Sequence, residues 1–243
     1  LNMKMDFKKK KNVKKKQPQK QSQKQPSNVP AIVFFSISAV VIVAVLVFMM
    51  IGNDPTTESV SSYDFTYDGQ PFIGDENAPI KIVEFFDYKC PACKHFAEEV
   101  LPQLKEDFID KGDVQLFYMN FPILADDSYT AAEVGEAIYA QEREAFQTYY
   151  ETLFAEQQDE SKRWATKNFL MKFVEDHLPE IDLAQLEKDL EENTYAQAVE
   201  EDQIVGENAG VSATPTLFIN GKEFRNWSDY EAIKEEINRL LEQ

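Results

Sequence analysis

The two cysteines of the chain, Cys90 and Cys93, are separated only by Pro91 and Ala92. They can form a disulfide with each other or with a cysteine of another chain. A disulfide that closes so short a loop removes little chain entropy from the unfolded state, so it stabilises a fold only slightly. The spacing therefore favours thiol–disulfide exchange over a purely structural bridge.

The position of the pair favours a reactive thiolate. The apolar run IKIVEFF predicts a strand, and apolar residues at helical spacing after the pair predict a helix. Cys90 then lies at the first helical turn, where free backbone N–H groups and the helix dipole stabilise an anion and lower the pKa of a thiol. We expect Cys90 to be the nucleophile and Cys93 the thiol that resolves the mixed disulfide, with Lys89 and Lys94 adding positive charge nearby.

Two other roles for the pair stay open. The C-x-x-C pattern is also half of a zinc site, and His95 and His177 are the further soft ligands that the sequence offers. The second alternative is an inert structural disulfide.

The segments after the pair complete an α/β pattern. A β-branched and aromatic run predicts a second strand, and an Asn-Gly pair between two apolar runs predicts a hairpin with a type I′ turn. Apolar residues at helical spacing predict a helical insertion at about 128–209. Ser228 and Glu231 form a capping box that predicts the start of the last helix. The predicted strands are 80–86, 114–124, 216–219 and 222–224, and the predicted helices of the insertion are 129–154, 162–177 and 183–208.

The N-terminal part of the chain has a different composition. Residues 1–30 hold ten Lys and one acidic residue among Gln, Pro and Ser, which predicts a disordered basic tail. The 22 residues 31–52 carry no charge and are long enough, at about 1.5 Å per residue, to cross a bilayer as a helix. Residues 53–74 predict a stalk and residues 75–243 a folded domain.

The lysines before the apolar run predict a single-pass membrane protein with a cytoplasmic N-terminus and an extracytoplasmic domain. A cleaved secretory signal is the alternative, but the run exceeds the usual core of about 7 to 15 residues and no Ala-x-Ala site follows it. Residues 53–243 hold 15 Lys and Arg against 42 Asp and Glu, a net charge of −27, which argues against nucleic acid as a partner. Carboxylate density alone could hold Ca²⁺, although no loop has the EF-hand spacing.

The stretch IVEFFDYKCPACKHF, together with ATPTLFING, resembles the DsbA-like family of extracytoplasmic disulfide-bond-forming proteins, and in particular its membrane-anchored Gram-positive members. The resemblance covers about residues 72–243. It implies a thioredoxin-like α/β fold with an inserted helical domain, preceded by one N-terminal transmembrane helix. The 121 residues between Cys93 and Pro215 leave room for this insertion.

The resemblance also implies roles for individual residues. Cys90 matches the exposed nucleophile of the family and Cys93 matches its buried partner. Glu84 matches the acid that the family buries beneath the disulfide as a proton relay. Thr214 and Pro215 match the cis-proline loop, which faces the disulfide and holds the substrate chain.

The sequence allows a second interpretation of Glu84 and of Pro215, and Ala92 differs from the residue that strongly oxidising members of the family often carry. Glu84 lies in an apolar run, where burial raises a carboxyl pKa as a proton acceptor requires; the alternative is an acid on an edge strand that faces solvent. Pro215 could follow an ordinary trans peptide bond, because only about 5–6% of X-Pro bonds are cis. Strongly oxidising family members often carry His at the position of Ala92, which Ala cannot replace, so the oxidising strength stays open.

Together these features predict an extracytoplasmic thiol–disulfide oxidoreductase. We expect a dithiol oxidase that introduces disulfide bonds into secreted or surface proteins with free thiols and is reoxidised by a membrane quinone-linked thiol oxidase. No cofactor is expected beyond the redox-active Cys90–Cys93 disulfide. The alternatives are an extracytoplasmic disulfide reductase or isomerase, for example in cytochrome maturation, and a non-catalytic binding or chaperone module that uses the helical insertion.

Overall fold

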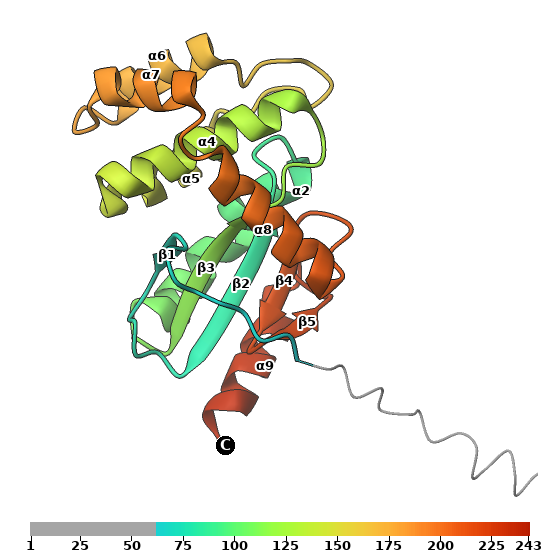
Figure 1. The fold of residues 1–243 in the computed structure, drawn as a ribbon. Helices are drawn as coiled ribbons and strands as arrows, with labels where there is room; N and C mark the ends of the chain where they lie inside the picture. The colour runs from blue at the N-terminus through green and yellow to red at the C-terminus, as the bar shows by residue number, and fades with distance from the viewer. Residues whose placement is uncertain (1–61) are drawn as a thin grey trace, which may run out of the picture. The chain divides into compact units, whose positions relative to one another are not determined.

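The structure is a computed structural model that describes residues 62–243 (Figure 1). The predicted basic tail, the predicted membrane span and the first part of the predicted stalk lie outside the described residues. Within 62–243, every helix is too short or too polar to cross a bilayer.

A five-stranded sheet forms the centre of the fold, with the strand order β1-β3-β2-β4-β5. The central strand β2 runs parallel to β3 and antiparallel to β4, and the two edge strands pair antiparallel with their neighbours. A nearly continuous apolar run is what a strand covered on both faces needs, and β2 and β3 have such runs. The strands are β1 (Phe72–Ile73), β2 (Ile80–Phe86), β3 (Val114–Asn120), β4 (Thr216–Ile219) and β5 (Lys222–Phe224).

One helix follows β2 and carries the cysteine pair at its start. It alternates between α-helical and π-helical turns, and the backbone N–H of Leu101 bonds the carbonyl of Phe96, five residues back, just before Pro102. Pro102 has no N–H to donate, so the wider turn lets the helix continue past it. The successive parts are α2 (Pro91–His95), η1 (Phe96–Val100), α3 (Leu101–Leu104) and η2 (Lys105–Ile109).

The predicted helical insertion is confirmed, but it contains five helices instead of three. The predicted helix 129–154 is broken at Glu142, whose backbone is extended, and the predicted helix 183–208 is broken at Asn193, which has a φ of 52°. The predicted helix from Lys162 begins only at Lys167, where the Thr166 side chain caps it. The helices are α4 (Asp126–Gln141), α5 (Arg143–Ala155), α6 (Lys167–His177), α7 (Leu183–Glu192) and α8 (Ala196–Ala209).

The C-terminal hairpin follows the prediction from Asn-Gly. Asn220 and Gly221 have φ angles of 47° and 77°, as a type I′ turn requires. The last helix, α9 (Tyr230–Leu241), begins one residue later than predicted, because the Asp229 carboxylate accepts the cap hydrogen bond from the Ala232 N–H and Ser228 does not. The predicted capping box is therefore wrong.

Residues 62–74, which the sequence assigns to a stalk, pack against the sheet. Phe65 is buried beside the rings of Phe85 and Phe218. The backbone N–H of Tyr63 donates to the carbonyl of Gly221 at 2.7 Å, so this segment contacts the hairpin directly. A Cβ at Gly221 would lie 2.3 Å from the carbonyl oxygen of Tyr63, which is why only glycine fits there.

Apolar cores lie on both faces of the sheet, and the alternation of β2 divides its side chains between them. Val83 and Phe85 face the smaller core. Ile82 and Phe86 face the larger one, which also contains the cysteines and most of the insertion. Glu84 lies between Ile82 and Phe86 and therefore points to the same face as the cysteines. In Figure 1 the helices α4 to α7 gather beyond the end of the sheet where β2 leads into α2.

Candidate active site

The two thiols lie at the start of α2. Cys90 immediately precedes the helix with an extended backbone, φ −77° and ψ 119°, and Pro91 occupies the first helical position, where its missing N–H costs no hydrogen bond. Cys90 keeps 7% of its surface exposed, whereas Cys93 is fully buried. Both are free thiols, so the structure describes the dithiol state.

The surroundings of Cys90 favour its thiolate. The hydrogen bond from the Cys93 thiol makes the largest contribution, burial opposes it, and hydrogen bonds from the Thr214 side chain and from the backbone amides of Cys93 and Ala92 add to it. Together they lower the pKa of Cys90 from 9.0 to about 6. The amides are free for this purpose because the first N–H groups of a helix have no partner within it. At pH 7 Cys90 is therefore mostly a thiolate, which is both a nucleophile and a good leaving group.

The loop before β4 meets Cys90 from the other side. In the thiol form, Cys90 Sγ donates to the carbonyl oxygen of Thr214 at 3.2 Å, although the two residues are 124 positions apart. The Thr214–Pro215 peptide bond is cis, and Pro215 is buried. A backbone carbonyl next to the reactive sulfur is where an extended substrate chain can be held.

Glu84 lies beneath the pair, in the middle strand of the sheet, so the alternative of an exposed edge-strand acid is wrong. Burial raises the pKa of Glu84 from 4.5 to about 8; the hydrogen bond from the Tyr150 hydroxyl, 2.7 Å from Oε2, opposes this shift, and the charge of Cys90 adds to it. Burial also raises the pKa of Cys93 well above its ordinary value, and the charges of Cys90 and Glu84 contribute. Glu84 is thus neutral at pH 7, when it can give a proton to the buried sulfur.

The two lysines that flank the pair have other partners than the thiolate. Lys89 is buried, and its Nζ lies 2.7 Å from Asp127 Oδ1 and 2.9 Å from the carbonyl oxygen of Lys162. Lys94 bonds Glu98 and the last carbonyls of α5. The expectation that these charges stabilise the thiolate is not met, because both side chains fasten the start of α2 to the insertion.

Gln157, in the loop after α5, is a further residue of the site that the sequence did not indicate. Its side-chain amide donates to the carbonyl oxygen of Tyr88 at 2.9 Å and to that of Cys90 at 3.0 Å. These two bonds hold the turn that presents Cys90 to its neighbouring amides. Sequence alone gives no signal for them, because Gln157 lies 67 residues from Cys90 in a polar loop.

The buried pair of Lys89 and Asp127 gives a testable effect on stability. Asp127 Oδ2 also accepts hydrogen bonds from the backbone N–H groups of Trp164 and Ala165. Asp127→Ala leaves the Lys89 charge buried without a partner, and we expect it to lower the free energy of unfolding by about 3 kcal/mol. Urea unfolding followed by tryptophan fluorescence measures this.

The control is the double variant Lys89→Met with Asp127→Asn, which removes both charges and keeps a side-chain oxygen that can accept the two backbone hydrogen bonds. We expect it to regain most of the lost stability. A loss of less than about 1 kcal/mol in Asp127→Ala would contradict a buried, charged Lys89.

The zinc alternative finds no support among residues 62–243, which contain no group of three or more His, Cys, Asp and Glu side chains placed to hold a metal ion. His95 is exposed, with its ring centroid 6.2 Å from that of Trp227. His177 contacts Glu156, with Nε2 3.1 Å from Oε1. Neither histidine therefore forms a metal site with the cysteines among the described residues.

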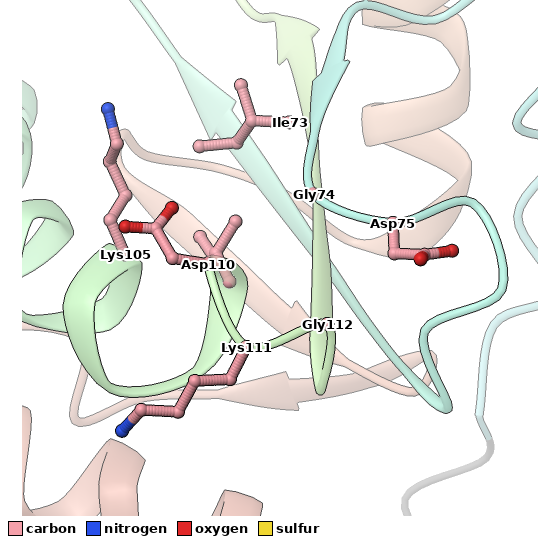
Figure 2. A pocket seen from close by; sticks show the side chains of 8 residues that line it. Ile73, Gly74, Asp75, Lys105, Asp110, Lys111 and Gly112 are labelled. Carbon is pink, nitrogen blue, oxygen red and sulfur yellow. The ribbon is translucent and has the colours of Figure 1, made fainter.

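Three surface hollows lie away from the thiols. The one in Figure 2, of about 460 Å³, is lined by residues 73–75 on one side and by η2 and the turn after it on the other, with Lys105 and Asp110 facing Ile73. The other two, of about 440 and 420 Å³, lie beside β1 and α5 and beside η1. None of the three is lined by the cysteines or by the Thr214–Pro215 loop.

Several known proteins are similar to this chain over most of its length. The family model described as thioredoxin matches residues 66–239. The chain is 35% identical over 209 residues to the probable disulfide bond formation protein D of Bacillus anthracis, which covers 86% of this chain and 94% of that protein. It is 36% identical over 173 residues to the disulfide bond formation protein D of Bacillus subtilis, covering 71% and 78%.

Solved structures show the same fold. The crystal structure of oxidised BdbD from Bacillus subtilis matches with a TM-score of 0.71 and 35% identity, covering 75% of this chain and 98% of that one. DsbA of Chlamydia trachomatis matches with a TM-score of 0.66 and 26% identity, covering 73% and 94%. The predicted thioredoxin-like fold with a helical insertion is confirmed.

A pair of thiols at the start of the helix that follows the central strand, on a thioredoxin-like fold, defines a DsbA-like thiol–disulfide oxidoreductase. The sequence identity to the two Bacillus proteins, over most of the chain, identifies the family within this class. The chain belongs to the family of the disulfide bond formation proteins D.

Proposed function

We propose that this protein introduces disulfide bonds into secreted or surface proteins by passing on the Cys90–Cys93 disulfide. The observation that carries the proposal is the difference between the two sulfurs: Cys90 has a pKa lowered to about 6, while burial raises the pKa of Cys93 well above its ordinary value. One sulfur is therefore made to leave as an anion and the other to be protonated when it is released.

The exchange proceeds in two steps. A substrate thiolate attacks Cys90 Sγ of the disulfide, the Cys90–Cys93 bond breaks, and Cys93 leaves as a thiolate that takes the proton of Glu84. A second substrate thiolate then attacks the substrate sulfur of the mixed disulfide and displaces Cys90 as a thiolate. Two electrons pass from the substrate dithiol to the cysteine pair, and the substrate gains one disulfide.

The loop at Thr214 and Pro215 is proposed to hold the substrate during these steps. The Thr214 carbonyl lies 3.2 Å from Cys90 Sγ, where it can accept a hydrogen bond from the backbone of an extended chain once the thiol proton is gone. Such a contact reads the backbone and not the side chains, which suits an enzyme that acts on many unfolded proteins.

We further propose that residues 31–52 anchor the protein in the cell membrane as a single span, with its N-terminus in the cytoplasm and its cysteine pair outside. In this arrangement a quinone-linked thiol oxidase of the same membrane takes the two electrons from the reduced pair. The chemistry needs no cofactor besides the two cysteines. The suggestion of Ca²⁺ at the acidic surface stays a prediction.

A reduction potential from titration in glutathione buffers tests the direction of the exchange. At pH 7, a shift in the pKa of Cys90 from 9.0 to about 6 stabilises the reduced form by about 1.4 kcal/mol, which raises the potential by about 30 mV. We expect a value clearly above the roughly −270 mV of thioredoxin, and a pair that thiol trapping finds mostly oxidised in cells. A value near that of thioredoxin, with a mostly reduced pair, would instead support the reductase or isomerase alternative.

A further inference from the structure

The two oxygens of the Glu84 carboxyl group have different surroundings. Oε2 accepts a hydrogen bond from the hydroxyl of Tyr150, at 2.7 Å. Oε1 is buried and has no hydrogen-bond partner. Tyr150 belongs to α5 of the insertion, 66 residues further along the chain, and is itself fully buried. The two sides of the carboxyl group are therefore not equivalent.

Among the described residues, Tyr150 is the one that donates a hydrogen bond to the Glu84 side chain. Tyr118 on β3 lies opposite Glu84 in the sheet, but its hydroxyl is donated to Gln147 Oε1 at 2.8 Å. Leu217, opposite on β4, is apolar. The other titratable groups that act on Glu84, or on which its charge acts, are Tyr88, Cys90 and Cys93.

We propose that Tyr150 is a positioning residue for the exchange: its hydroxyl holds Glu84 Oε2 and thereby assigns the carboxyl proton to Oε1. In the structure the Tyr150 hydroxyl is the donor to Glu84 Oε2, and it has no other hydrogen-bond partner among residues 62–243. An oxygen that already accepts a short hydrogen bond is the carbonyl-like one, so the acid proton sits on the other. This proposal rests on the exchange at Cys90 and Cys93 proposed above.

The assignment has a consequence in each direction of the reaction. When Cys93 is released as a thiolate, the proton on Glu84 Oε1 moves to Cys93 Sγ, and Tyr150 stays bonded to the carboxylate that forms. When the pair is reoxidised, Glu84 in its carboxylate form takes the proton from Cys93 before the Cys93 sulfur attacks. No electrons pass through Glu84 or Tyr150. The hydroxyl stabilises the charged form of Glu84 more than its neutral form, because a hydrogen bond to a carboxylate is the stronger one.

The test uses the full-length chain and the variant Tyr150→Phe, which removes one hydroxyl. The reduced protein is mixed with oxidised glutathione, quenched with acid and weighed by mass spectrometry, so that the mixed disulfide with glutathione and the closed disulfide are counted separately. The rate of closure by Cys93 is measured against pH. We expect Tyr150→Phe to raise the midpoint of this profile by about one pH unit, because Glu84 loses the donor that favours its charged form.

Tyr118→Phe is the matched control, since it removes an equally buried hydroxyl that bonds Gln147 and not Glu84. We expect its midpoint to stay within a few tenths of a unit of the unchanged chain. In a Glu84→Gln background, which has no carboxyl group to titrate, Tyr150→Phe should have no further effect on the profile.

An unshifted midpoint in Tyr150→Phe, an equal shift in Tyr118→Phe, or a shift that persists with Glu84→Gln would each overturn the proposal. If Tyr150→Phe does not fold, the infrared spectrum of the unchanged chain provides the test. The carboxyl band of Glu84 is the one that disappears in Glu84→Gln, and our assignment requires it to show the C=O stretch of a hydrogen-bonded carbonyl. A free carbonyl band would contradict it. Failure of the underlying exchange looks different, since no mixed disulfide would then form in the unchanged chain.

Discussion

Cys93→Ala is expected to abolish turnover and to leave the protein joined to its partner through Cys90 as a mixed disulfide. Cys90 keeps its place at the helix start and its contact with Thr214, so it still attacks disulfides. Without the second sulfur nothing within the chain can displace the partner, because residues 90 and 93 are its two cysteines. Non-reducing gel electrophoresis and mass spectrometry detect the trapped species.

Cys90→Ser is the companion variant, and it should neither trap a partner nor oxidise a reduced test protein. Cys93 cannot substitute for it, since burial both hides its sulfur and raises its pKa. If Cys90→Ser keeps the function of the protein in cells although it oxidises no test protein, the binding or chaperone module would be favoured over the exchange chemistry.

Glu84→Gln is expected to change how stability depends on pH. Folding raises the pKa of Glu84 from 4.5 to about 8. Its contribution to the stability of the native state is therefore fully present below about pH 4.5 and is lost as the pH rises through about 8. The size of the shift corresponds to roughly 4–5 kcal/mol. Glu84→Gln removes this loss, so the variant should become more stable than the unchanged chain above pH 8.

The measurement compares urea unfolding of the two chains from pH 5 to pH 9 with the cysteines kept reduced. The difference between the chains is the informative quantity, since Glu136 and Asp202, whose pKa values burial raises to about 8 and about 7, give a fall of the same sign in both. Cys90 gives a rise in both, because its pKa is lowered. An exposed acid, as in Glu207→Gln, is the control. Parallel curves for Glu84→Gln and the unchanged chain would mean that the carboxylate is not buried as described.

Local signals explain which elements of the fold could be predicted. The run from Ile80 to Phe86 contains mostly β-branched and aromatic residues, and the Asn220-Gly221 pair specifies its turn through backbone conformation alone. The breaks at Glu142 and Asn193 could not be predicted in this way, because helical spacing continues across both. At Glu142 the chain turns so that α5 packs on α4, and after Asn193 it turns so that α8 packs on α4, as α7 does; both breaks are tertiary effects.

The residues of the candidate site also fall into those that the local sequence indicates and those that only the fold brings in. The cysteines could be singled out from their place at a strand-to-helix junction, and Glu84 from the resemblance of the strand before them to the DsbA-like family. Tyr150 and Gln157 come from the insertion, and only the folded chain brings them to Glu84 and to the backbone of Cys90. The positive charge expected from Lys89 is the instructive error, since neighbours in sequence can point away from each other, and this side chain is directed to Asp127.

The pH dependence of the reaction between Cys90 and iodoacetamide tests the central claim most directly. The rate follows the thiolate, so the midpoint of the profile is the pKa of Cys90 in the native protein. We predict a midpoint near pH 6 in the full-length chain and a higher one in Cys93→Ala, because the Cys93 thiol donates the most important hydrogen bond to that sulfur. A midpoint near 9 in the unchanged chain, equal to that of the urea-unfolded protein, would contradict this account.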